Sequence, residues 1–352
     1  MLRSLYSGIS GMKVNQTKLD VIGNNLANVS TTAFKGSRVN FSTTISQTLG
    51  SASAASDSLG GVNGKQVGLG AQIASIDKIM SQGSMQSTSR SLDVAVDGSG
   101  YFMVATGPAL TGDADDSIAI DKNGLGDMPA NTSVAYTRDG SFVLDNEGNL
   151  LTSKGYRVLG FAMKSGEDKQ NPANPIDNIE KNGTVLYVES NNDTKAMDDK
   201  LVSLKIPDKV TKIIKDPTGG GNDTRTEVAV KSFNISADGL ITGVLETGEI
   251  TALGQIAMSS FKNEVGLTDI GNNMYEPSGS SGAAIISSGK NSTTNRNSSG
   301  YGDILQGYLE MSGVDMAEQF TDMIVATKAF QAAGKTITTG DEILSEIINL
   351  KR

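Results

Sequence analysis

The 352-residue sequence predicts a multidomain α+β protein, in which a long helix at each end pairs with the other as a coiled-coil-like domain and mainly antiparallel β domains lie between them. Two observations predict the helices. All seven prolines lie between Pro108 and Pro277, and apolar residues at both ends recur at alternating steps of three and four. A third observation predicts the β domains, because short apolar runs alternate with Asp-Gly and Gly-rich turns.

Residues 1–30 and 315–352 are expected to form the helical domain. The periodic positions of the first segment are Leu2, Leu5, Ile9, Met12, Gln16, Leu19, Gly23 and Leu26. Those of the last segment are Phe320, Met323, Thr327, Phe330, Gly334, Ile337, Asp341, Leu344 and Ile348. Asp315 is the predicted N-cap of the second helix, with Glu318 three residues later. Neither helix can bury its stripe alone, so we expect each to contact the other or further copies of the chain.

The segments between the helices suggest two or three domains in all. Residues 31–90 are expected to be an extended connector, rich in Ser, Gly and Ala over 43–70, which is either a flexible linker or ordered only against neighbouring copies. From residue 91 the pattern is that of strands, and 91–175 with 232–306 are predicted to form one β domain. The more charged residues 176–231 are predicted to be a small inserted outer β domain.

Composition excludes several classes of function. The net charge of -9 argues against nucleic acid and anionic membrane as partners, and no apolar run is long enough to insert into a membrane. Histidine and cysteine are absent, which removes His-based acid–base catalysis, thiol nucleophiles, disulfides and the common zinc sites. A carboxylate pair or a Ser/Lys dyad remains possible in principle. We therefore predict a protein that is not an enzyme, with no catalytic residue, cofactor or metal ligand.

Three short motifs have structural explanations that we favour. Gly334-Lys335-Thr336 copies the end of a phosphate-binding loop, but Ala329 replaces the required glycine and the run lies in a helical pattern. The Asp145-Asn-Glu-Gly-Asn run lacks the spacing of a calcium loop and is predicted to be a hairpin turn. The acids Asp113, Asp115 and Asp116 are predicted to lie in a solvated loop.

The two ends together resemble the bacterial flagellar rod and hook family of axial proteins. The first match comprises Ser7-Gly8-Ile9-Ser10-Gly11-Met12, Leu19-Asp20-Val21-Ile22-Gly23-Asn24-Asn25-Leu26-Ala27-Asn28-Val29 and Thr32-Ala33-Phe34-Lys35. The second comprises Gly307-Tyr-Leu-Glu-Met-Ser-Gly-Val-Asp, Phe320-Thr-Asp-Met-Ile and Ile337-Thr-Thr-Gly-Asp-Glu-Ile-Leu. Leu92-Asp-Val-Ala-Val, Tyr136-Thr-Arg-Asp-Gly-Ser-Phe and Leu253-Gly-Gln-Ile are similar to the family's β domain. Gly313 and Thr327-Lys328-Ala329-Phe330 depart from the family pattern, which affects the packing of the C-terminal helix.

The resemblance implies a structural subunit that polymerises into a tube, with the terminal helices on the inner wall and the β domains outside. Within the family, the inserted segment and the soft connector favour the hook subunit, whose curved, flexible tube acts as a universal joint that transmits torque around a central export channel. Contacts between subunits are expected from the terminal helices. The predicted contact residues are Leu5, Ile9, Met12, Leu19, Asn24, Asn25, Leu26, Phe320, Met323, Phe330, Ile337, Leu344 and Ile348.

The resemblance also implies partners and a location. The expected partners are other copies, the distal rod protein, the hook–filament junction proteins, the hook cap protein and the flagellar type III export apparatus. The expected location is the extracellular hook or basal body, reached without a cleaved signal peptide, with terminal segments that fold only on assembly. The main alternative is the distal-rod protein of the basal body. A secreted adhesin-like binding module and a carboxylate-based hydrolase are weaker alternatives.

Overall fold

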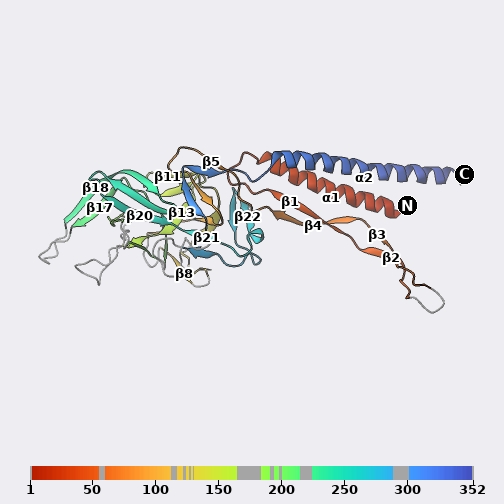
Figure 1. Ribbon diagram of the computed structural model, residues 1–352, viewed down its shortest axis with the longest axis horizontal. Helices are drawn as coiled ribbons and strands as arrows, with labels where there is room; N and C mark the ends of the chain where they lie inside the picture. The colour runs from red at the N-terminus through yellow and green to blue at the C-terminus, as the bar shows by residue number, and fades with distance from the viewer. Residues whose placement is uncertain are drawn as a thin grey trace. The chain divides into compact units, whose positions relative to one another are not determined.

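The computed structural model describes residues 2–54, 60–111, 117–121, 124–126, 128–129, 131–164, 184–190, 194–197, 200–214, 224–287 and 301–350. The chain forms two compact units (Figure 1). We call the first, residues 1–81 with 312–352, the helical unit, and the second, residues 82–311, the β unit. The helical unit therefore combines two segments that are distant in sequence, as the paired ends of the chain predict, whereas the β unit is one continuous segment.

The helical unit contains α1 (Leu2–Ala27) and α2 (Met316–Leu350), which lie side by side and run in opposite directions (Figure 1). The prediction of a long helix at each end is confirmed. The backbone N–H groups of Ala317 and Glu318 donate to Asp315 Oδ1 at 2.8 and 3.3 Å, so the predicted N-cap is present. At the same end of the pair, where α1 ends, the side-chain amide of Asn28 donates to Asn24 O at 2.9 Å, just beyond the last helical residue of α1.

Two antiparallel hairpins follow α1 in the region predicted to be an extended connector. In the first, β1 (Ser37–Thr43) pairs with β4 (Ala71–Lys78), and a register shift follows Asn40. In the second, β2 (Ser46–Gly50) pairs with β3 (Lys65–Gly68). The described part of the Ser- and Gly-rich segment therefore contains paired strands. These strands leave large apolar side chains exposed, namely Phe41, Ile45, Leu49, Val67 and Ile76.

The β unit is built on one antiparallel sheet. Its main path runs β17 (Lys209–Ile214), β18 (Thr224–Ile235), β19 (Leu240–Leu245), β20 (Ile250–Ile256), β13 (Arg157–Phe161), β7 (Tyr101–Thr106), β10 (Ser133–Thr137), β23 (Met274–Glu276) and β22 (Thr268–Gly271). Strands attached to this path are β8 (Ile118–Asp121), β9 (Gly124–Leu125), β11 (Phe142–Leu144), β12 (Leu150–Thr152), β16 (Lys200–Ser203), β21 (Met258–Ser260) and β24 (Ile285–Ser287). The predicted, mainly antiparallel β architecture is confirmed.

Shorter pairs complete the β unit. They are β5 (Met85–Ser87) with β26 (Tyr308–Glu310), β6 (Val94–Asp97) with β25 (Asp303–Gln306), and β14 (Met163–Lys164) with β15 (Lys195–Ala196). A 3-10 turn, η1 (Glu264–Gly266), precedes β22. Because β5 pairs with β26, the β unit begins within the predicted connector, at residue 82 in place of 91.

In the described part of 176–231, which was predicted to be an inserted domain, strands pair with strands of the flanking segments. In that segment, β16 pairs with β13 and β8, and β18 runs through the predicted boundary at residue 231 to pair with β19. The charged composition that suggested a separate domain comes partly from β18. Its polar side chains from Arg225 to Lys231 lie mostly in solvent. Residues 165–183 and 215–223, including the glycine run at 219–221, lie outside the described residues.

Three tyrosines form an aromatic cluster around Phe261 in the β unit. The rings of Tyr101 and Tyr136 meet Phe261 edge-on, with centroids 5.8 and 4.9 Å away, and Tyr275 packs edge-on against Tyr101. All three tyrosines are buried, and burial raises the pKa of each phenol well above its ordinary value. The native state therefore holds these phenols neutral.

We expect the β unit to lose stability as the pH rises above about 10, the ordinary pKa of tyrosine. The native pKa values of the three phenols are raised, so their contribution to stability is complete below the unfolded pKa and is lost at higher pH, where only the unfolded state releases these protons. Tyrosinate absorbance, followed together with the β circular dichroism signal, should show a phase at high pH that coincides with unfolding. Complete titration in one phase, with the β signal unchanged, would contradict the expectation.

Candidate assembly interface

Small residues mediate the contact between α1 and α2. A Cβ atom added to Gly8 would lie 2.8 Å from Thr336 Oγ1, and one added to Gly340 would lie 2.9 Å from Leu5 Cδ2. On α2, Ala326 and Gly340 are the buried residues among those described. The close approach of the two helices therefore depends on glycine and alanine at their shared face.

The contacts between α1 and α2 include both predicted seam positions and the residues just before them. On α1, Leu5 and Met12 are predicted positions, and Gly8, Gly11, Lys18 and Asn25, which also contact α2, each precede one. On α2, Gln319, Asp322, Ala326, Ala333 and Gly340 face α1 or are buried, and precede Phe320, Met323, Thr327, Gly334 and Asp341. Hydrophobic periodicity alone does not mark these small and polar contact residues.

The predicted contact residues consequently fall into two groups. Leu5 and Met12 lie against α2, near Gly340 and Gly334. The half-buried members of the set are Leu5, Met12, Leu19, Leu26, Met323, Ile337 and Leu344, and Asn25 is buried. The exposed members are Ile9, Asn24, Phe320, Phe330 and Ile348.

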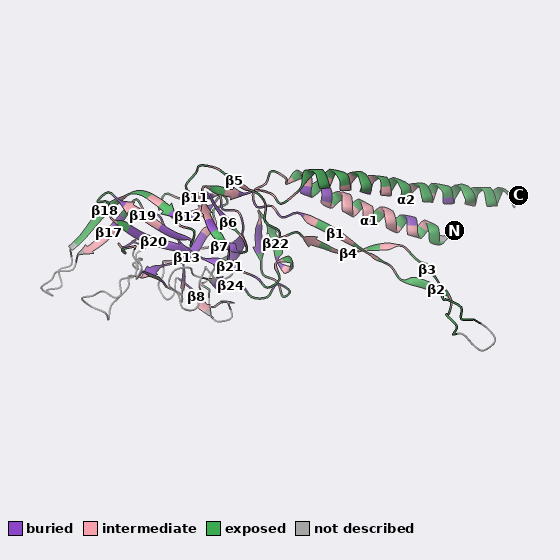
Figure 2. Cartoon of the chain, in the orientation of Figure 1, coloured by how far each residue is buried: buried purple, intermediate pink, exposed green. Residues whose placement is uncertain are grey.

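Most of α2 is exposed in the single chain (Figure 2), and the exposed residues include large apolar side chains. Ile324 is 62% exposed and Ile348 is 67% exposed, although both are aliphatic. The exposed set on α2 is Met316, Phe320, Ile324, Val325, Phe330, Ile343, Ile347, Ile348 and Leu350. A helix with so many exposed apolar side chains is a candidate site of contact with another protein.

Asn25 joins three elements of the helical unit. Its Nδ2 donates to Ser37 O at 2.8 Å and to Gln319 Oε1 at 3.1 Å, and its Oδ1 accepts from Ser37 N at 2.9 Å. The side chain, which comes from α1, thus binds the first residue of β1 and the first turns of α2. The sequence predicted a contact between copies for Asn25, and gave no sign of these partners within the chain, which are 12 and 294 residues away.

We expect Asn25→Asp to destabilise the helical unit by about 1–3 kcal/mol, because the new carboxylate presents oxygen to Ser37 O, which then loses its donor. The helical circular dichroism signal during urea unfolding measures the effect. Asn24→Asp is the matched control, since Asn24 is exposed and its Oδ1 accepts from Asn28, as a carboxylate can. Equal stability losses in the two variants would show that the Asn25 contacts contribute little.

The short motifs noted in the sequence have structural roles wherever the structure describes their residues. Thr336 lies inside α2 against Gly8, so the run Gly334-Lys335-Thr336 does not form a phosphate-binding loop. The backbone N–H groups of Glu147 and Asn149 donate to Asp145 Oδ1, which confirms the predicted turn. These bonds hold the pKa of Asp145 below its ordinary value against the opposing effect of burial. Asp113, Asp115 and Asp116 lie outside the described residues.

The described residues hold no group of three or more acidic side chains arranged to bind a metal ion. Within the same ranges, neither helix combines the length and the hydropathy required to cross a membrane.

Comparison with known proteins identifies the family. Three family models match the chain: "Flagella basal body rod protein" over residues 5–35, "Flagellar hook protein FlgE/F/G D1 domain" over 127–243, and "Flagellar basal body rod FlgEFG protein C-terminal" over 305–350. The chain is 40% identical to the flagellar basal-body rod protein FlgG of Bacillus subtilis, over the full length of both. It belongs to the flagellar rod and hook protein family.

Other members of the family match over their whole length. The flagellar hook protein FlgE of Borreliella burgdorferi is 32% identical, and the basal-body rod protein FlgG of the same organism is also 32% identical, each with complete coverage of both chains. The resemblance inferred from the two ends is thus confirmed. The rod and hook proteins are structural components of the flagellum and not a family of enzymes.

Proposed function

We propose that this chain is the subunit of the flagellar hook, which polymerises into a curved, flexible tube around an export channel and transmits torque from rod to filament. The exposed apolar face of α2 carries the proposal. Complete burial of one large aliphatic or aromatic side chain stabilises a complex by about 1.5–3 kcal/mol, so the exposed set on α2 provides ample driving force for association. The α1–α2 pair would line the inner wall, and the β unit would lie outside it.

The predicted contact residues fit this arrangement in two ways. Ile9, Phe320, Phe330 and Ile348 are exposed in the single chain and are available to neighbouring copies. Leu5, Met12, Ile337 and their half-buried neighbours would hold the helix pair in the conformation that neighbours bind. Head-to-tail contact between identical subunits produces an open helical polymer and not a closed ring.

The exposed β2–β3 hairpin of the helical unit favours the hook over other axial structures. The β2–β3 hairpin is almost entirely exposed and projects Ile45 and Leu49 into solvent, so its conformation can change with the spacing of neighbouring copies. The distal rod protein, the hook–filament junction proteins, the hook cap protein and the flagellar type III export apparatus would be its partners. The extracellular flagellum would be its location.

The distal rod is the second candidate, because the B. subtilis relative with 40% identity is named a basal-body rod protein. The shape of the purified polymer distinguishes the two functions. A hook subunit should form curved tubes in electron micrographs, and a rod subunit should form straight ones.

Removal of residues 1–30 or 315–352 tests whether the terminal helices are required for polymerisation. We expect either truncation to abolish tubes while the β circular dichroism signal remains, because the β unit has its own core, which includes Phe102, Phe142 and Leu253. Electron microscopy and sedimentation measure assembly. Tubes that still form after either truncation would exclude the terminal helices as the polymer interface.

A further inference from the structure

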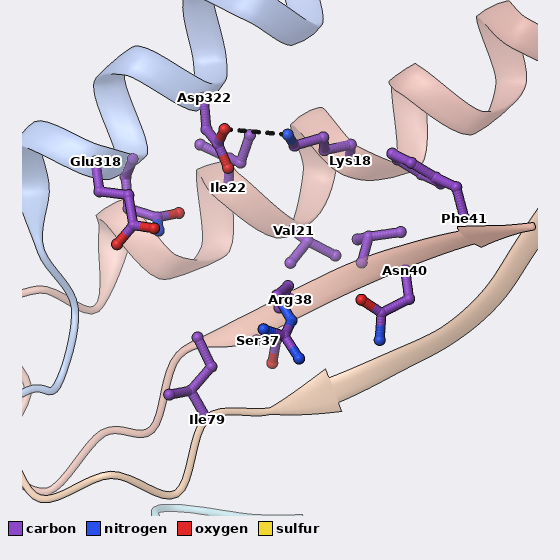
Figure 3. A pocket seen from close by; sticks show the side chains of 12 residues that line it. Lys18, Val21, Ile22, Ser37, Arg38, Asn40, Phe41, Ile79, Glu318 and Asp322 are labelled. Carbon is purple, nitrogen blue, oxygen red and sulfur yellow. Dashed lines mark ion pairs between the residues drawn. The ribbon is translucent and has the colours of Figure 1, made fainter.

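A groove of about 440 Å³ lies within the helical unit, bounded by α1, α2 and the β1–β4 hairpin (Figure 3). Its apolar lining comes from Val21 and Ile22 of α1, Phe41 of β1, and Ile79. Phe41 and Ile79 are 45% and 40% exposed, so an apolar ligand could bury a substantial part of both side chains.

Charged side chains of opposite sign flank this apolar lining. Arg38 extends from β1 on one side and Glu318 from α2 on the other, and both are exposed (Figure 3). Beside them, Lys18 and Asp322 form an ion pair at 3.1 Å that links α1 to α2. A matching ligand would therefore be an amphipathic segment with an acidic group on one side and a basic group on another.

The opposite end of the same helix pair carries such a segment. Ile343, Ile347 and Leu350 occur at positions i, i+4 and i+7 of α2, the spacing of a helix that binds in an apolar groove. They are 45%, 46% and 82% exposed, respectively. Glu346 lies beside this stripe in the helical pattern, and the sequence continues with Lys351 and Arg352.

We propose that the groove binds the end of α2, residues 343–350, from a second copy of this chain. Residues 322 and 343 are separated by about 30 Å along α2, at 1.5 Å per residue, so the groove and this segment cannot meet within one chain. A contact between opposite ends of the same helix pair is heterologous and repeats without closing. The inference rests on the proposed polymer, and it identifies one of the contacts that would build it.

Charge favours the end of α2 over β2, another exposed segment with a large apolar side chain. The β2 strand, whose sequence is Ser46-Gln-Thr-Leu-Gly50, presents Leu49 but has no charged residue to match Arg38 or Glu318. Glu346, which lies beside the apolar stripe of α2, has the charge that Arg38 requires. We therefore expect an ion pair between Arg38 of one copy and Glu346 of the next.

Crosslinking tests the contact directly, because the chain has no cysteine of its own. A variant with Phe41→Cys and Ile347→Cys is polymerised and treated with a short bismaleimide. We expect a ladder of covalent dimers, trimers and higher oligomers on denaturing gels. The matched control combines Phe41→Cys with Ser345→Cys, since Ser345 is in the same turn but on the other side of the helix and should give at least tenfold less product.

A charge exchange tests the predicted ion pair. Arg38→Glu and Glu346→Arg should each raise the critical concentration for assembly about tenfold or more, because each places like charges together. The double variant should restore assembly toward that of the unaltered chain. Both positions are exposed, and an unchanged helical signal in each monomer would show that the variants fold.

The outcomes separate this inference from the proposed function. Normal polymers without a ladder, or single charge variants that assemble like the unaltered chain, would overturn the groove contact and leave the polymer in place. A ladder between Phe41→Cys and Leu49→Cys, with none to Ile347→Cys, would assign the groove to the β2–β3 hairpin and overturn the inference. Failure of the unaltered chain to polymerise would overturn both.

Discussion

Arg138→Met is expected to destabilise the β unit by about 3–5 kcal/mol, the usual cost of removing one partner of a buried ion pair. Arg138 Nη1 lies 3.4 Å from Glu310 Oε2, and both side chains are almost completely buried. Arg138 Nη2 also donates to Gly98 O at 2.7 Å, and its guanidinium lies over the ring of Tyr101. Methionine fills similar volume but leaves the Glu310 carboxylate buried without this counter-charge.

Urea unfolding followed by the β signal measures this cost. Lys209→Met is the matched control, because the ion pair between Lys209 and Glu227 is exposed and should contribute at most about 1 kcal/mol. The double variant Arg138→Met with Glu310→Gln should lose less than the sum of the two single variants, since it removes both charges and keeps an oxygen for the N–H of Gly83. A loss of less than about 1 kcal/mol for Arg138→Met would show that solvent reaches the pair.

The structural features that the sequence predicted best depend on interactions between residues that are close in sequence. The helix ends followed from the N-cap Asp315 and from the absence of proline, and the hairpins followed from turns such as Asp238-Gly239, where Gly239 adopts a positive φ of 81°. Each of these signals involves side chains within a few residues of the backbone groups that they satisfy, so a local pattern is sufficient.

What the sequence did not predict depends on distant partners. Arg138 and Glu310 are 172 residues apart, and Asn25 and Gln319 are 294 residues apart, so neither pair has a periodic signature. Hydrophobic periodicity emphasises Ile9 and Phe320, which are exposed, and gives no sign that Gly8 makes the close contact with α2. Whether the terminal segments order only on assembly stays a prediction.

Gly8→Leu should separate α1 from α2 and abolish assembly. The first added atom would already lie 2.8 Å from Thr336 Oγ1 and 3.1 Å from Ile337 Cγ1, and Thr336 is held by its bond to Ala333 O. Forcing extra methylene groups into such a contact costs about 1–3 kcal/mol, and it also displaces the α2 face that neighbouring copies would bind. Polymer yield by sedimentation and the unfolding midpoint of the helical signal measure the two effects.

Gly23→Leu is the matched control on the same helix. Gly23 is exposed and an added Cβ would have no neighbour within 4 Å, so leucine there should stabilise α1 by about 0.5–1 kcal/mol through its helix propensity. The pair of variants therefore separates propensity from packing, because both replace glycine by leucine in α1 and only one meets α2. If Gly8→Leu stabilises the helical signal as Gly23→Leu does and tubes still form, the two helices do not pack through small residues in the polymer. If Gly8→Leu instead unfolds the helix pair and abolishes tubes while the β signal persists, assembly requires the close approach of α1 and α2. The β unit then does not depend on that contact.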